Sequence, residues 1–283
     1  MLFALIFLAS LLQPDLPTVE SLFEQLAPAP ANGKLARSAE QHRAVVLIHG
    51  YYIHLQDKHV GKAEFRPWQQ GDSTLVKELA KNADVFALAY GQDVSLETIV
   101  AESKLKSGVA QLRKLGYRDI VLVGHSAGGL IARQFVEDHP DAGVTSVVQV
   151  CSPNSGSPLA GLYAPKSQRA FRQCLSEQGR QECLKLRADK RIPEKVQFVC
   201  VVACLDGAKG TDGVVSCVSQ WPEDLQKQGI PAVKVTGDHR AVVRDAMIAE
   251  VLAGLVRENQ PRWDAEQIDK AKKTILGDGA ERK

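Results

Sequence analysis

The sequence places one serine in a setting that can make it a nucleophile. Residues 124–128 read Gly-His-Ser-Ala-Gly, directly after an apolar run and directly before a segment with helical periodicity. A Gly-x-Ser-x-Gly pattern between a strand and a helix is typical of a nucleophile elbow, a sharp turn that exposes the serine hydroxyl. Gly124 and Gly128 keep this turn free of colliding side chains, and the N-terminus of the helix favours developing negative charge. We therefore expect Ser126 to be a nucleophile; the alternative is an ordinary turn.

A base is needed next, because a serine hydroxyl is a poor nucleophile at neutral pH without one. Of the seven histidines, only His239 follows the fifth apolar run. It stands in Gly-Asp-His-Arg (237–240), between a short apolar run and the last amphipathic segment. A loop at this place can reach back over Ser126, so we predict His239 as the general base.

The third member of such a site is an acid that orients the histidine. Two carboxylates follow the fifth apolar run, Asp206 in Cys-Leu-Asp-Gly and Asp212 in Thr-Asp-Gly-Val-Val-Ser. Each is next to a glycine, where an aspartate also serves as an ordinary turn residue. Spacing alone does not separate the two candidates.

Acyl transfer also requires hydrogen-bond donors for the oxyanion that forms in the transition state. One donor is expected from the backbone N–H of Ala127, which follows the serine. The other is expected from the loop after the first strong apolar run, which begins His-Gly-Tyr-Tyr at residue 49. We predict the N–H of Tyr51, with Gly50 allowing a close approach; a simple strand-exit turn is the alternative.

The elements that must position these residues alternate along the chain. The predicted strands cover residues 44–48, 84–90, 119–123, 144–150, 196–203 and 232–235. The predicted helices cover residues 73–82, 98–115, 127–139, 223–228 and 241–256. Continuous apolar strands alternating with helices predict an α/β fold, with a mostly parallel sheet covered by helices on both faces.

Four segments fall outside this alternation. Residues 2–12 are apolar except for one serine, a run that is too short to span a bilayer and typical of a signal-peptide core. Residues 1–17 are therefore predicted to direct export; the alternative is a buried first strand or a wrongly assigned start codon in a cytoplasmic protein. Residues 18–40 are predicted to be a leader with one short helix near 18–26. Residues 158–195 are charged and helix-prone, and they predict a small cap, either a lid or a structural excursion. Residues 257–283 predict a charged tail, helical and solvated or frayed, after a main domain over residues 41–256.

Composition excludes several functions. Lys and Arg number 35 against 33 Asp and Glu, a net charge of +2, which argues against a nucleic-acid binder that works through a basic surface. The six cysteines lack zinc-site spacing, so no metal is predicted, and the reaction outlined here needs no cofactor. In an exported chain the cysteines suggest disulfides. A bond between Cys174 and Cys183, or between Cys204 and Cys217, would close a short loop; buried free thiols are the alternative.

Over residues 44–256 the chain resembles the α/β-hydrolase superfamily, and within it bacterial lipases and lipase-like serine esterases. The resemblance rests on VVLIHG at 45–50, GHSAGG at 124–129, SPNSGSPLA at 152–160, TDGVVS at 211–216 and GDH at 237–239. It implies that Asp212, in an Asp-x-Val-Val-like motif, is the acid rather than Asp206. The chain departs from the family at Asn154, where a histidine is usual, and at Ile53, where the oxyanion loop commonly has a second glycine.

The sequence thus predicts a serine hydrolase of small-molecule or lipid esters, working as a monomer with transient contact to a lipid interface. An acyltransferase or thioesterase with the same three residues is a rival reading. A second alternative is a protein of the same fold that binds a ligand without catalysis. An inert Ser126 together with retained ligand binding would favour this alternative.

Overall fold

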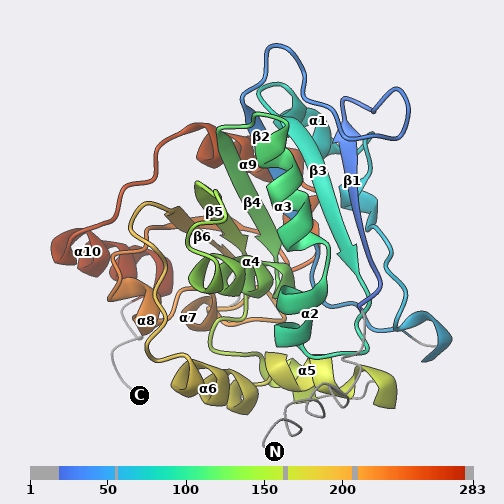
Figure 1. Ribbon diagram of the computed structural model, residues 1–283. Helices are drawn as coiled ribbons and strands as arrows, with labels where there is room; N and C mark the ends of the chain where they lie inside the picture. Colours follow the sequence, from blue (N-terminus) through green and yellow to red (C-terminus); the bar gives the residue numbers. More distant parts are fainter. Residues whose placement is uncertain (1–18, 55–56, 162–164, 206–209, 278–283) are drawn as a thin grey trace, which may run out of the picture.

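A computed structural model describes residues 19–54, 57–161, 165–205 and 210–277. The predicted signal peptide and Asp206 lie outside these residues. One seven-stranded sheet in the order β1-β3-β2-β4-β5-β6-β7 forms the centre of the fold (Figure 1). Its strands are β1 (Ser21–Ala27), β2 (Arg43–Ile48), β3 (Asp84–Tyr90), β4 (Asp119–His125), β5 (Ser146–Val150), β6 (Gln197–Cys204) and β7 (Ala232–Thr236). All neighbouring pairs are parallel except β1 with β3, so the predicted mostly parallel sheet is confirmed.

Helices cover both faces of this sheet, as predicted. Side chains alternate along each strand: Val46 and Ile48 of β2 belong to one apolar core, while Val45 and Leu47 belong to the other. The first core includes residues of α2 (Leu96–Glu102), α3 (Leu105–Lys114), α4 (Ala127–Asp138), α7 (Cys217–Gln220), α8 (Glu223–Gln226) and α10 (Ala265–Leu276). The second includes residues of α1 (Thr74–Ala80) and α9 (Ala246–Arg257).

The first described segment corrects one prediction. Residues 21–27 form a strand that pairs antiparallel with β3, rather than the predicted short helix. The burial pattern of β1 explains why its sequence did not predict a strand. Few of its side chains are fully buried, and apolar and polar residues do not alternate clearly along it. An edge strand of this kind takes its conformation from the backbone hydrogen bonds of its neighbour.

The predicted helix over 98–115 is two helices in the structure. α2 ends at Glu102 and α3 begins at Leu105. Ser103 between them has an extended backbone, with φ −70° and ψ 167°. Its backbone N–H still bonds the carbonyl of Ile99, so the break leaves the end of α2 capped.

The segment 158–195 packs against the carboxyl edge of the sheet, at the bottom of Figure 1. It contains the 3₁₀ turns η3 (Pro158–Gly161) and η4 (Lys166–Gln168) and the helices α5 (Arg169–Leu175) and α6 (Glu177–Leu186). Phe171 of α5 is fully buried in the core and stacks on Tyr51. Arg180 of α6 is buried and donates from Nε to the backbone oxygen of Asn154 at 3.1 Å. These contacts favour a cap that is fixed to the domain over one that opens freely.

The end of the chain also contacts the domain. α10 buries Ile268 and Ile275 in the core, so the predicted helix of the charged tail has one buried face instead of being solvated all round. Three further 3₁₀ turns complete the described elements: η1 (Asp57–His59), η2 (Pro67–Gln69) and η5 (Ala241–Val243). No helix within the described part of the chain is both long and apolar enough to cross a membrane.

One disulfide joins Cys204, the last residue of β6, to Cys217, the first residue of α7. Cys174 and Cys183 are both free, so the suggested pairing of these two is wrong. The loop closed by the disulfide contains Asp212, which ties that residue to the end of a sheet strand.

Candidate active site

The segments that follow the carboxyl ends of β4, β6 and β7 form the site. Ser126 follows β4, Asp212 follows β6 and His239 follows β7. In a parallel sheet these ends lie along one edge, which is where open α/β sheets place their ligands. Ser126 has φ 56° and ψ −124°, a backbone conformation that non-glycine residues rarely adopt. Such strain is held at functional sites by the surrounding structure, and here the Ser126 N–H bonds the Val150 carbonyl oxygen at 2.8 Å.

The three side chains form a continuous chain of hydrogen bonds. His239 Nε2 is 2.9 Å from Ser126 Oγ, and His239 Nδ1 is 2.6 Å from Asp212 Oδ2. All three residues are buried, with Asp212 1% exposed. The structure therefore brings together the serine, the histidine and the motif-selected aspartate, in the order that proton transfer from a serine to an imidazole requires.

Asp212 is held by donors on both carboxylate oxygens. Its Oδ1 accepts from the N–H groups of Val214 and Val215 at 2.8 and 2.7 Å. Its Oδ2 accepts from Gln220 Nε2 at 3.2 Å as well as from His239. These bonds fix the orientation of the carboxylate toward His239 Nδ1. Sequence reasoning missed Gln220, because a glutamine in a short helix carries no motif.

His125, next to the serine, supports the histidine loop. Its Nε2–H donates to the backbone carbonyl of His239 at 2.7 Å, and its ring packs edge-on against Trp68. Burial, reinforced by the neighbouring His239, lowers the pKa of His125 to about 3. The ring is therefore neutral at physiological pH and acts as a hydrogen-bond donor that positions His239.

The buried neutral state of His125 makes stability depend on pH. The unfolded chain protonates this ring near pH 6.5, but the folded protein does so only near pH 3. Between these values the unfolded state binds more protons, so the free energy of unfolding decreases as pH falls, by up to about 1.4 kcal/mol per pH unit. We expect His125→Gln to flatten this dependence in urea unfolding at pH 7, 6 and 5. Equal slopes for the two proteins would contradict the assignment.

Glycines let three backbone segments meet at the serine. A Cβ on Gly128 would lie 2.2 Å from the carbonyl oxygen of Ile48, and one on Gly124 would lie 2.5 Å from the backbone of Gly128. A Cβ on Gly50 would lie 2.6 Å from Ser126 Cβ. The turn thus packs directly against the end of β2, and none of these contacts leaves room for a methyl group.

We expect Gly128→Ala to destabilise the fold by about 1–3 kcal/mol and to displace Ser126, because the obstructing atoms are backbone. Chemical unfolding and the rate of ester cleavage measure the two effects. Gly161→Ala is the matched control, since a Cβ there would meet no atom within 4 Å. Equal stability of the two variants would show that the turn tolerates a side chain.

The two predicted oxyanion donors flank the serine. Ala127 begins α4, and Tyr51 follows Gly50. Neither backbone N–H has an acceptor among the residues that the structure describes. Within the described part of the chain, nothing competes with a developing oxyanion for these two donors.

Two glutamines that sequence reasoning missed hold the oxyanion loop. Gln92 Nε2 donates to the Gly50 carbonyl at 3.0 Å, and its Oε1 accepts from the Tyr52 N–H at 3.1 Å. Gln168, from the cap, donates to the Tyr52 carbonyl at 2.7 Å and accepts from the His54 N–H at 3.2 Å. Gln92 lies just past β3, at the carboxyl edge, and this position was the only available signal.

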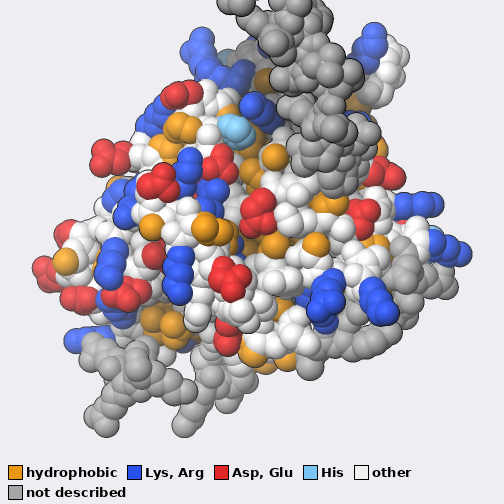
Figure 2. All heavy atoms as spheres, turned by 60° about the horizontal axis from the view of Figure 1, so that its bottom comes forward, with side chains coloured by type: hydrophobic (Ala, Val, Ile, Leu, Met, Phe, Trp, Pro, Cys, Tyr) orange, Lys and Arg blue, Asp and Glu red, His pale blue; other side chains and the backbone are white. Residues whose placement is uncertain are grey.

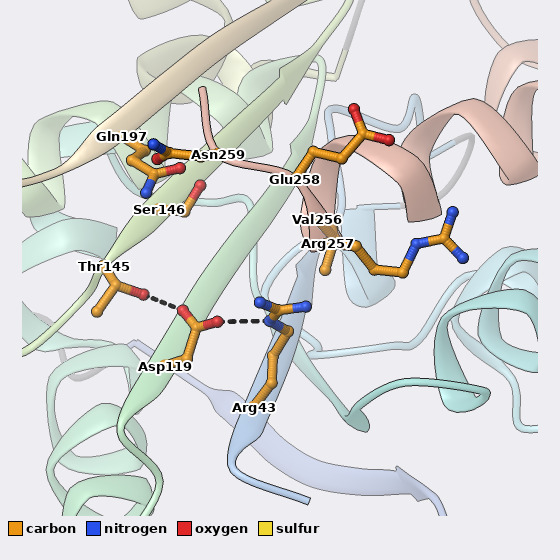
Figure 3. Close-up of a pocket in the computed structure, with 9 residues that line it drawn as sticks. All are labelled: Arg43, Asp119, Thr145, Ser146, Gln197, Val256, Arg257, Glu258 and Asn259. Carbon is orange, nitrogen blue, oxygen red and sulfur yellow. Dashed lines mark hydrogen bonds and ion pairs between the residues drawn. The ribbon is translucent and has the colours of Figure 1, made fainter. Parts of the chain in front are cut away.

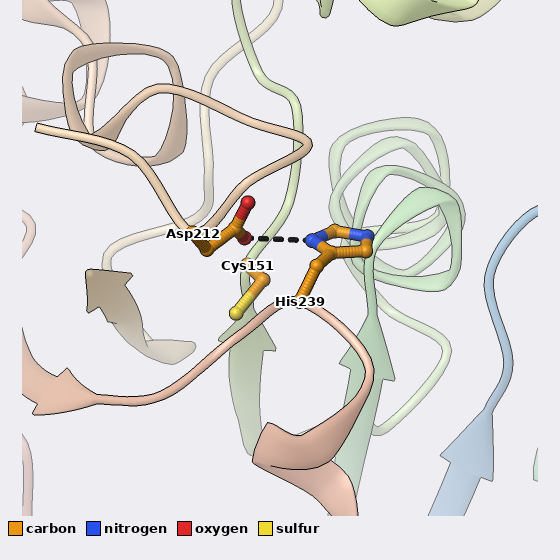
Figure 4. Close-up of side chains that lie close together, drawn as sticks. All are labelled: Cys151, Asp212 and His239. Carbon is orange, nitrogen blue, oxygen red and sulfur yellow. Dashed lines mark hydrogen bonds and ion pairs between the residues drawn. The ribbon is translucent and has the colours of Figure 1, made fainter. Parts of the chain in front are cut away.

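Cys151, Asp212 and His239 form a group of three potential metal ligands, with their ligand atoms within 4.8 Å of one another (Figure 4). The Asp212–His239 hydrogen bond already occupies two of these atoms. Burial raises the pKa of the Cys151 thiol well above its usual value, so the thiolate that a metal prefers is disfavoured. The arrangement fits a hydrogen-bonded acid–base pair better than a metal site.

A cavity of about 260 Å³ lies elsewhere, at the amino ends of β2, β4, β5 and β6 (Figure 3). Arg43 and Asp119 form an ion pair across it at 2.5 Å, and Thr145 donates a hydrogen bond to Asp119. Ser126 lies at the opposite ends of these strands, so this cavity is not the candidate active site.

Asn154, where the resembling family has a histidine, is a buried structural residue. Its Nδ2 donates to Gln149 Oε1 at 2.9 Å and to the Gln220 carbonyl at 3.0 Å. Its Oδ1 accepts from Arg133 at 3.2 Å. The amide thus joins the loop after β5 to the helix that carries Gln220, which in turn contacts Asp212.

Comparison with known proteins agrees with this architecture. Residues 97–194 match the family model of the alpha/beta hydrolase fold. The mature form of the Bacillus licheniformis lipase BlEst2 superposes with a TM-score of 0.60 at 14% identity, covering 83% of this chain and 97% of that one. A metagenomic carboxyl esterase has a TM-score of 0.53 at 17% identity, with 81% and 80% covered. The Legionella pneumophila phospholipase PlaB has a TM-score of 0.58 at 12% identity, with 82% and 62% covered.

No curated protein matches the chain in sequence. At these identities the solved structures establish the fold, and the family model matches its middle part, from α2 through the cap. The chain thus has the α/β-hydrolase fold, and its structure is similar to those of lipases and esterases.

Proposed function

We propose that this protein is a serine hydrolase that cleaves carboxylic esters through an acyl-enzyme. The observation that carries the proposal is the chain of hydrogen bonds from Ser126 Oγ through His239 to the buried Asp212. It is supported by the strained turn at Ser126 and by the N–H groups of Ala127 and Tyr51, which have no acceptor among the described residues. Structural neighbours include a lipase and a carboxyl esterase, which supports the ester substrate class.

In the proposed reaction these groups act in turn. Ser126 Oγ attacks the ester carbonyl carbon while His239 Nε2 accepts its proton, and the carbonyl oxygen becomes an oxyanion bound by the N–H groups of Ala127 and Tyr51. Asp212 keeps the imidazole in the tautomer with its proton on Nδ1 and stabilises the imidazolium. His239 then gives the proton to the leaving alcohol. A water molecule, activated by the same histidine, releases the acid and restores Ser126.

The substrate is proposed to be a small-molecule or lipid ester handled by a monomer. Figure 2 turns the bottom of the molecule in Figure 1 forward, and Lys and Arg side chains are interspersed there with Asp and Glu. Tyr52 and Ile53, on the oxyanion loop, are exposed apolar side chains. They supply the kind of surface that an acyl chain or a lipid interface contacts.

A panel of 4-nitrophenyl esters from acetate to palmitate tests the proposal. We expect 4-nitrophenol release above background, with a maximum at one acyl length, and acid as the product. Matched thioesters and added alcohols identify the rival activities: faster thioester cleavage, or transfer of the acyl group to the alcohol in preference to water, would overturn ester hydrolysis. No turnover of any ester by folded protein would overturn it as well.

Export is proposed for the chain on two grounds, the apolar residues 2–12 and the disulfide between Cys204 and Cys217. Disulfides persist in oxidising compartments and are rare in the cytosol. Fractionation of expressing cells, with N-terminal sequencing of the product, tests it. An uncleaved chain in the cytosol would contradict the proposal.

A further inference from the structure

A group of buried nitrogen atoms beside the oxyanion loop has no role in the reaction described above. His49 Nε2, His54 Nε2 and both Nε and Nη2 of Arg66 are buried without a hydrogen-bond partner among the described residues. Unpaired buried donors and acceptors are rare, and each costs about 1–3 kcal/mol. Four such atoms on three neighbouring side chains call for an explanation.

The three side chains meet around two tyrosine rings. The Arg66 guanidinium lies 4.5 Å from the centre of the Tyr52 ring, and the Tyr52 ring meets the His54 ring edge-on at 5.4 Å. His49 stacks on Tyr90 at 4.2 Å. Both histidines are at least nine-tenths buried, so their free nitrogens are shielded from bulk water.

Arg66 leaves a positive charge uncompensated here. It forms no ion pair with any described residue, and its burial lowers its pKa from the ordinary value. Glu64 is close enough to favour the charged guanidinium electrostatically, but it is exposed and not in contact. Burial, with Arg66 as the second cause, lowers the pKa of His49 to about 3 and also lowers that of His54. An oxyanion against Arg66 would pair its free N–H donors, and its negative charge would favour the protonated form of both histidines.

The free atoms match an oxyacid group in chemistry as well as in charge. His49 Nδ1–H donates to the Gly50 carbonyl at 2.9 Å, which leaves Nε2 as an acceptor while the ring is neutral. Arg66 offers N–H donors to the oxygens of a carboxylate or phosphate. A hydroxyl of a protonated oxyacid could donate to His49, or the histidine could take up that proton.

The position of the group ties it to the candidate active site. His49 directly precedes Gly50, which packs against Ser126, and His54 is three residues after Tyr51. The geometry points to an anion-binding subsite formed by His49, His54 and Arg66, which selects esters that carry a second, negatively charged oxyacid group. This inference rests on the proposed ester hydrolysis and specifies its substrate class.

Matched ester pairs test the subsite. One pair is the 4-nitrophenyl monoester of adipic acid with 4-nitrophenyl hexanoate; the other is butanoylglycerol phosphate with butanoylglycerol. We expect wild type to prefer the anionic member of at least one pair, and the pair it prefers separates a carboxylate from a phosphate ligand. Arg66→Gln is expected to lower that anionic-to-neutral ratio of kcat/KM at least tenfold, mainly through KM, with partial recovery in Arg66→Lys.

Arg169→Gln is the matched control, because Arg169 is an exposed arginine on the cap, and it should leave the ratio unchanged. Preference of wild type for both neutral esters, or equal losses on both members of a pair in Arg66→Gln, would overturn the subsite. If wild type cleaves no ester at all, the proposed function fails instead. Calorimetric binding of the adipate monoester to wild type and Arg66→Gln then still decides the subsite: tenfold weaker binding to the variant supports it, and equal binding contradicts it.

Discussion

Replacing Ser126 with alanine is expected to lower kcat for the best 4-nitrophenyl ester by about 10⁴-fold or more. The change removes one oxygen atom from the centre of the hydrogen-bond chain to His239 and leaves the turn itself intact. Without the hydroxyl no acyl-enzyme can form, and only binding and oxyanion stabilisation remain. Because the loss affects the chemical step, KM should change much less than kcat. Steady-state kinetics on both proteins measure the effect.

Ser152→Ala is the matched control for that experiment. Ser152 is also buried at the carboxyl edge of the sheet, but its hydroxyl has no partner among the described residues. We expect this variant to retain wild-type kcat within a few-fold. Retention of most activity in Ser126→Ala, in protein whose circular dichroism spectrum is unchanged, would show that another group is the nucleophile.

The second large effect is expected from Asp212→Asn. The amide cannot provide the negative charge that stabilises the imidazolium, and its NH₂ group would favour the wrong tautomer of His239. We expect kcat to fall by about 10⁴-fold, the size of loss that this substitution causes when an aspartate orients a catalytic histidine. The backbone bonds from Val214 and Val215 to Oδ1 can persist, so the loop should keep its shape.

Asp206→Asn completes the comparison, because spacing in the sequence did not decide which of the two aspartates orients His239. We expect this variant to keep kcat within a few-fold of wild type. Circular dichroism and urea unfolding of both variants separate loss of activity from loss of fold. A large loss in Asp206→Asn with near-normal activity in Asp212→Asn would transfer the role of the acid to Asp206.

The sheet and the serine turn could be predicted because their physical constraints are local. Continuous apolar runs such as 119–123 are buried on both faces of a parallel sheet, and few other structures suit them. The turn at Ser126 requires small neighbours, since side chains at 124 or 128 would meet backbone atoms. Each requirement restricts the residue types at particular positions, so it can be recognised in the sequence. The structure has these elements at the predicted positions.

Other features depend on contacts between distant residues, which one sequence does not display. β1 is a strand because β3 offers it an edge, so its weakly patterned residues predicted a helix instead. Gln92, Gln168 and Gln220 matter through bonds to segments far away in sequence, and a glutamine carries no spacing rule of its own. The choice between Asp206 and Asp212 likewise needed a family motif, since both aspartates follow the same strand.

The most direct test of the central claim is to treat the folded protein with a fluorophosphonate and locate the adduct by peptide mass spectrometry. Fluorophosphonates phosphonylate a serine only when a base activates it, as His239 is placed to do for Ser126. We predict one adduct, on Ser126, that is lost in Ser126→Ala and forms much more slowly in Asp212→Asn. No adduct on folded protein, or an adduct on a different residue, would contradict it.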